Sequence, residues 1–91
     1  MDDLGSRISY MVLERGVTVF SSDGEQLGSV VEVRRDVATD IFDGIVFAMT
    51  AGFARHRFVD APEVGEIYER GVILRIDAAA AAELPAPRDI A

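Results

Sequence analysis

Short β-type segments at regular spacing constrain this sequence more than any other feature. Between residues 17 and 76, runs rich in β-branched and aromatic residues alternate with turn residues, a pattern typical of strands. The expected strands are residues 17–20, 27–35, 41–49, 55–60, 64–68 and 71–77. About six short strands in so small a chain predict an all-β fold, a small closed or nearly closed barrel, because closure removes exposed strand edges.

The turn between the first two strands is the most distinctive local signal. Asp23-Gly24 predicts a hairpin, since both positions tolerate positive φ. Gly28 is expected at a bulge or a close backbone approach. The two glycines of "SSDGEQLGS" could also suggest a phosphate-binding loop, but the chain has no lysine and the segment leads into a strand instead of a helix. We therefore predict a turn without a nucleotide site.

Alternation within the strands predicts the side chains that fill the barrel. In residues 27–35, Val31 and Val33 share one face and charged residues take the other. Residues 41–49 are apolar on both faces, so this strand is expected inside the sheet. The expected core side chains are Val31, Val33, Ile45, Phe47, Phe58, Val72, Leu74 and Ile76.

Both ends of the chain are less regular. Residues 78–84 are rich in alanine and follow Asp77, so we expect a short C-terminal helix with an aspartate N-cap. Pro85 ends this helix, and residues 85–91 are expected to fray. Residues 1–12 fit both helical and strand spacing, which leaves a short strand or an irregular arm. The chain is thus expected to form one domain, residues 1–91, with the barrel over about 13–77.

The composition excludes several classes of site and partner. The chain has no cysteine, which excludes disulfides, thiolate catalysis and cysteine-based metal sites. Its net charge is −7, so we expect no nucleic-acid partner. No apolar run reaches the roughly 18 residues of a membrane span. The acidic first residues lack the basic start of a signal peptide, and we expect a cytoplasmic protein.

Few residues suggest catalysis or metal binding. Asp36, Asp40 and Asp43 do not have the spacing of a calcium-binding EF-hand loop, so a solvated acidic loop is expected. His56 is the sole histidine and has no sequence partners for a metal site or a catalytic triad. We therefore predict no catalytic residue, no metal and no cofactor.

The candidate interaction residues are Phe53, Arg55, Arg57 and Phe42. Phe53 lies in a glycine turn, where an aromatic ring could fold over the barrel mouth or anchor another chain. Arg55 and Arg57 would share one strand face and could grip a carboxylate or a phosphate. Phe42 belongs to the strand with two apolar faces, whose outer face needs cover. This surplus of apolar surface predicts a homo-oligomer, most simply a homodimer.

Several segments together resemble the PRC-barrel family. They are "DGEQLGSVVEV", "IFDGIVF", a glycine turn, "RFVDAPEVGEI" and "GVILRI", in that order, over roughly residues 13–77. The resemblance extends to the barrel of the reaction-centre H subunit and to the C-terminal domain of the ribosome maturation factor RimM. It implies a PRC-type β-barrel, here as a stand-alone bacterial protein, and a role in assembly or docking without catalysis.

Three functions follow as alternatives. The features above favour a non-catalytic protein-interaction or scaffold module that binds itself and an unidentified protein partner. A small-molecule or ligand-binding barrel is the alternative, although so small a barrel should be filled by its own side chains. A carboxylate-dependent hydrolase fits less well, because the carboxylates are scattered over turns and exposed faces.

Overall fold

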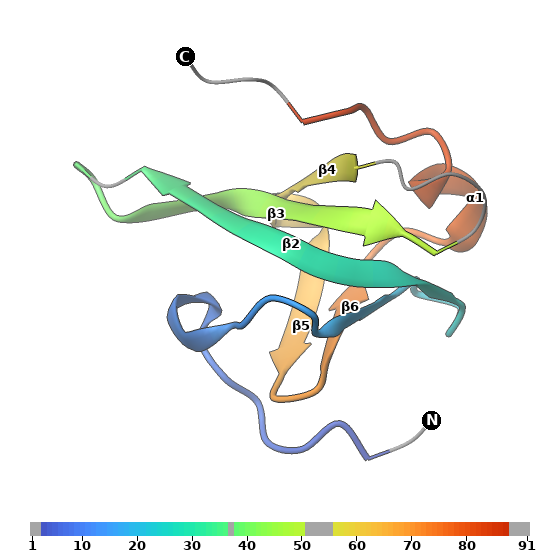
Figure 1. The fold of residues 1–91 in the computed structure, drawn as a ribbon, viewed down its shortest axis with the longest axis horizontal. Coiled ribbons are helices and arrows are strands. Elements are labelled where there is room, and N and C mark those ends of the chain that lie inside the picture. Colours follow the sequence, from blue (N-terminus) through green and yellow to red (C-terminus); the bar gives the residue numbers. More distant parts are fainter. Residues whose placement is uncertain (1–2, 37, 51–55, 88–91) are drawn as a thin grey trace.

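The computed structural model describes residues 3–36, 38–50 and 56–87. They form one six-stranded sheet and a short C-terminal helix, so the fold is mostly β (Figure 1). The strands are β1 (Thr18–Phe20), β2 (Gln26–Asp36), β3 (Ile41–Met49), β4 (His56–Asp60), β5 (Val64–Tyr68) and β6 (Gly71–Leu74). The helices are η1 (Tyr10–Val12), η2 (Ala61–Glu63) and α1 (Ala78–Ala81), where η marks a 3₁₀ turn. All six expected strands are present.

The strands lie in the order β4-β3-β2-β1-β6-β5. Neighbours pair antiparallel, except β1 and β6, which run parallel. The predicted hairpin joins β1 to β2, and Gly24 has the positive φ (87°) that its turn requires. The sheet is strongly bent, and in Figure 1 β2 and β3 run across the direction of β5 and β6.

The two ends of this sheet do not pair with each other in the part of the chain that is described. No ladder joins β4 to β5, so the sheet is open and a closed barrel is not confirmed. Terminal segments cover the edges instead. The Ile8 amide donates to the Ile67 carbonyl beside β5 (2.9 Å), and the Phe58 amide in β4 donates to the Pro85 carbonyl (2.9 Å). Each edge strand is therefore partly paired, as an exposed edge requires.

The core lies inside the bend of the sheet. Ile45, Phe47, Val72 and Leu74 are buried as predicted, together with Val19 and Val59. The other four predicted core residues, Val31, Val33, Phe58 and Ile76, are only half-buried. The interior is therefore filled by side chains, but some of them differ from those that alternation predicted.

A bulge in β2 explains the first difference. The register between β2 and β3 shifts between Val30 and Glu32, and Val30 lies opposite Phe47. The extra residue, Val31, reverses the alternation, so Val30 takes the core position that was predicted for Val31.

In β4 the predicted face is wrong by one residue. Val59 pairs with the core residue Ile45 and is buried. Phe58 therefore points to the other face, where its ring lies over Gly44 and leaves no room for a Cβ there. Because side chains alternate with a period of two, a one-residue error exchanges the two faces.

Gly28 confirms the expected close approach. A Cβ built at Gly28 would lie 2.7 Å from the carbonyl carbon of Ala48 in the neighbouring strand. The register between β1 and β2 also shifts next to it, between Val19 and Phe20. Only glycine allows β2 and β3 to pair this closely.

The terminal segments are short and irregular. Residues 3–13, here called the arm, contain η1 and one isolated bridge between Arg7 and Tyr68. Leu13 ends the arm and is buried in the core. At the other end, Asp77 is the N-cap of α1, and its Oδ1 accepts from the Ala80 amide at 2.8 Å. Among the residues that the structure describes, none of the helices is long and apolar enough to cross a membrane.

Candidate functional site

The most exposed large apolar side chains of the described structure belong to η1 and to the first residue of β3. Met11 is 59% exposed, Val12 60% and Ile41 59%. These values matter because burying the exposed parts of these apolar side chains against another surface would be favourable. We call Tyr10, Met11, Val12, Ile41 and Phe42 the η1–β3 surface, in which Phe42 contacts Tyr10 and Ile41, the preceding strand residue, projects from the other face of β3.

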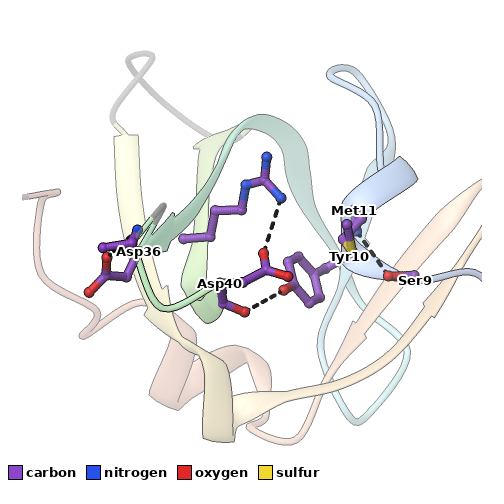
Figure 2. Close-up of polar contacts among 7 residues, drawn as sticks. Ser9, Tyr10, Met11, Asp36 and Asp40 are labelled. Atoms are coloured by element: carbon purple, nitrogen blue, oxygen red, sulfur yellow. Dashed lines mark hydrogen bonds and ion pairs between the residues drawn. The ribbon is translucent and has the colours of Figure 1, made fainter.

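An aromatic stack holds the two parts of this surface together. The rings of Tyr10 and Phe42 are stacked, with centroids 4.5 Å apart and planes at 14°. The Tyr10 hydroxyl also donates to the backbone carbonyl of Asp40 (3.1 Å), as Figure 2 shows. The arm is therefore attached to the β2–β3 hairpin by one large side chain.

Polar groups surround the stack and fix its two supports. On the hairpin, the Asp40 Oδ1 accepts from the Arg35 Nη1 at 3.3 Å, and the Asp36 carboxylate accepts from the Ala38 amide at 3.0 Å. On the arm, the Ser9 hydroxyl accepts from the Met11 amide at 3.1 Å and caps η1 (Figure 2). These polar contacts hold η1 and the β2–β3 turn in place on either side of the stack.

The four predicted interaction residues do not form one described cluster. Phe53 and Arg55 lie outside the described residues. Phe42 is half-buried in the Tyr10 stack. Arg57 is half-buried in β4 opposite Phe47, about 17 Å along β3 from Phe42 at the usual rise per residue.

Arg57 has a structural role in β4. Its Nη1 donates to the Leu84 carbonyl at 2.9 Å, which helps to hold the segment after α1 beside this strand. Its Nε is buried and has no hydrogen-bond partner among the residues that the structure describes. His56, the neighbouring residue, is exposed, as was expected from the sequence.

A groove of about 630 Å³ separates the arm from the body of the protein. The arm supplies Ile8 and Val12, and the chain around the start of β1 supplies residues 14–18. Glu69 and Arg70 close the groove at the turn between β5 and β6. Its lining combines apolar side chains with charges of both signs and could accommodate a small molecule or another segment of chain.

The two shifted pKa values arise in structural contacts. A hydrogen bond from the Ser21 hydroxyl lowers the pKa of Asp23, whose carboxylate also accepts from the Ala78 amide at 3.3 Å. Desolvation raises the pKa of Tyr68, and the Glu66 carboxylate, which accepts from its hydroxyl at 3.1 Å, adds to this effect. In the described ranges, no three His, Asp or Glu side chains are placed to share a metal ion.

Sequence reasoning missed the arm half of the surface. Ile8, Tyr10 and Val12 were seen to fit a strand, and Ile8, Met11 and Val12 a helix, yet neither pattern shows which side chains stay exposed. The usable signal was the number of large apolar residues in a segment outside the expected barrel.

No known family model matches this sequence, and no curated protein resembles it at a significant level.

Proposed function

We propose that this protein is a PRC-type barrel domain that acts as a non-catalytic protein-interaction or scaffold module and associates with a second copy of itself. The barrel part of the proposal is supported by the six strands, the bent sheet and the side-chain-filled interior. The closed form would require β4 and β5 to approach each other, and here the terminal segments cover those edges.

The exposure of Met11, Val12 and Ile41 carries the functional proposal. Because these side chains are about 60% exposed, burying the rest of each against a second copy would contribute roughly 1–2 kcal/mol per side chain. A two-fold dimer places the same patch on both sides of the interface, so a self-complementary apolar surface suffices. Stable interfaces bury more than about 1,000 Å² in total, so the neighbouring Tyr10 and Phe42 would take part.

Charged substitutions in the η1–β3 surface test the proposal. Met11→Asp and Ile41→Asp place a carboxylate where the dimer would exclude water, and each should weaken association by at least about tenfold. Ala79→Asp is the matched control, because it adds the same charge at an exposed position in the first turn of α1, where an acidic residue is tolerated.

Analytical ultracentrifugation of all four proteins gives the readout. We expect the wild type and Ala79→Asp to form dimers with similar dissociation constants and the two surface variants to be mainly monomeric. Equal dissociation constants for all four proteins would place any interface elsewhere, and monomers throughout would refute self-association.

A ligand-binding role is the second candidate, and the groove beside the arm favours it. Its volume of about 630 Å³ lies in the range of about 300–1,000 Å³ usual for small-molecule sites. An apolar fluorescent dye such as anilinonaphthalene sulfonate should then bind saturably to one site, and Val17→Asp, in the groove wall, should abolish the binding. Dye binding that is unchanged in Val17→Asp would count against this candidate.

A further inference from the structure

We propose that two copies of this chain exchange their arms, so that residues 3–13 of each copy pair with β5 and the β5–β6 turn of the other. The inference deepens and rests on the self-association proposed above. It names the segment that passes between the copies and the edge that receives it.

The arm is held on its receiving edge mainly by main-chain hydrogen bonds. Besides the Ile8–Ile67 bond, the Glu69 amide donates to the Ser6 carbonyl (3.0 Å) and the Arg70 amide to the Leu4 carbonyl (2.9 Å). Such bonds require an extended segment in the right register, as in strand addition by a peptide. The arm of a second copy meets that requirement as well as the chain's own arm.

The side-chain contacts of the arm are equally transferable. The Glu69 carboxylate accepts from the Ser6 amide at 2.9 Å, Leu4 packs against Gly71, and Asp3 lies 3.9 Å from the Arg70 guanidinium. All these partners belong to the β5–β6 hairpin or to the arm itself. Reciprocal exchange therefore recreates every one of them in the dimer.

The arm is bonded to the β5–β6 hairpin along residues 4–8, and a groove separates part of it from the start of β1. The groove of about 630 Å³ runs beneath it, with Ile8 and Val12 on one wall and Val17 on the other. Apart from Leu13, which packs in the core, the arm is fixed by edge hydrogen bonds and one aromatic stack. Such a segment opens at a lower free energy than the core does.

Two exposed residues link the arm to the sheet. Leu13, the last residue of the arm, is buried in the core and on exchange would enter the core of the other copy, whereas the Gly16 amide stays bonded to the Val30 carbonyl at 2.8 Å. Glu14 and Arg15 lie between them and are exposed. A change of backbone angles at these two residues is enough to direct the arm away from its own body, because a hinge needs only a few such positions.

Opening of the arm without exchange is unfavourable. We therefore expect the arm of a second copy to occupy the vacated edge of β5. Removing the arm leaves the Ile67 carbonyl of β5 without its donor and the amides of Glu69 and Arg70 without their acceptors. An unpaired strand edge is a template for another extended chain. In the exchanged dimer, the two links of residues 14–15 would pass each other in opposite directions about the two-fold axis. Glu14 of one copy could then lie beside Arg15 of the other.

The absence of natural cysteines allows a direct test at the Arg7–Tyr68 bridge. The flanking bonds, from Ile8 to Ile67 and from Glu69 to Ser6, make Arg7 and Tyr68 a non-hydrogen-bonded antiparallel pair. Cα atoms of such pairs are about 4.5 Å apart, which a disulfide can bridge. The single variants Arg7→Cys and Tyr68→Cys are unfolded together, refolded and mildly oxidised.

Exchange predicts a disulfide-linked heterodimer at least about fivefold more abundant than that formed by Arg7→Cys with Glu83→Cys, because pairing gives the thiols a high effective concentration. Glu83 is exposed after α1 and serves as the collision control. Equal yields from the two mixtures would overturn the exchange, whether or not the protein dimerises.

The double variant Arg7→Cys/Tyr68→Cys separates the exchange from self-association in general. Oxidised at low concentration as a monomer, it has its arm locked on its own β5, and its dimer dissociation constant should rise at least about tenfold and recover on reduction. If the locked and reduced forms dimerise equally, the arms are not exchanged but the proposed self-association stands. If neither form nor the wild type dimerises, both proposals fail.

Discussion

At the scale of single residues, Asp23 connects the first turn of the sheet to the C-terminal helix. Its carboxylate accepts hydrogen bonds from the Ser21 hydroxyl and from the Ala78 amide. Ser21 is fully buried, and its hydroxyl also accepts from the Glu25 amide at 3.0 Å. Sequence analysis predicted a turn here and not a phosphate-binding loop. In the structure, the Asp23 carboxylate accepts hydrogen bonds at this turn.

The lowered pKa of Asp23 predicts how stability changes with pH. The ionised carboxylate stabilises the fold above its ordinary pKa of 3.8, and this contribution disappears as the pH falls through the lower pKa of the folded state. The difference in unfolding free energy between wild type and Asp23→Asn, measured with urea, should therefore shrink between about pH 5 and pH 2. Asp43→Asn, at an exposed position in β3, is the control; a difference that grows towards low pH would contradict the assignment.

Phe47 is the largest fully buried side chain, and its truncation tests the core. We expect Phe47→Ala to lower the unfolding free energy by roughly 3–5 kcal/mol, the usual cost of deleting a core aromatic ring. Ile41→Ala, at a mainly exposed position, should change it by less than about 0.5 kcal/mol. A loss under about 1 kcal/mol for Phe47→Ala would show that this part of the sheet is packed differently.

The residues that sequence reasoning misplaced share one physical cause. Alternation correctly identified Ile45 and Phe47 in β3, where the pairing is regular. It failed at Val31 because a bulge inserts one residue into β2. It failed at Phe58 because we assigned the aromatic residue of this five-residue strand to the core face, whereas Val59 takes that face. Bulges and the phase of short strands depend on the neighbouring strand, which the local sequence does not contain.

At the scale of elements, the strands were easier to predict than the arm. Strand limits followed from turn residues, and β5 (Val64–Tyr68) has the predicted bounds. The C-terminal helix begins after Asp77 as expected but ends at Ala81, before the end of the predicted range at residue 84. The first half of the arm has no helix because Leu4, Ser6 and Ile8 hydrogen-bond to the β5–β6 hairpin, whereas bonds within the second half form the 3₁₀ turn η1.

The Tyr10–Phe42 stack should control how firmly the arm is held. Aromatic pairs contribute about 0.5–1.5 kcal/mol beyond their buried area, so Tyr10→Ala should raise the opening population of the arm several-fold. Hydrogen exchange of the Ile8 amide, bonded to the Ile67 carbonyl, reports this opening. Tyr10→Phe keeps the stack and loses only the bond to Asp40, so it should change exchange less. Equal protection in Tyr10→Ala and wild type would show that the stack does not hold the arm.

At the scale of the whole molecule, the arm links stability to association. It supplies three of the five residues of the η1–β3 surface, and its backbone covers the edge of β5. The strand with two apolar faces led sequence analysis to expect a dimer, and the structure covers Val46 fully while leaving Ile41 exposed. The way the terminal segments fold back decides which apolar side chains of β3 stay exposed. Local sequence patterns do not determine this folding.

The mass of the unmodified protein in solution tests the central claim most directly. Sedimentation equilibrium over a hundredfold range of concentration should show the mass rising from that of one chain, 9.9 kDa, towards twice that value. Such a rise is the result expected if the η1–β3 surface and the arm bind a second copy. A mass that remains at 9.9 kDa at the highest concentration would contradict self-association.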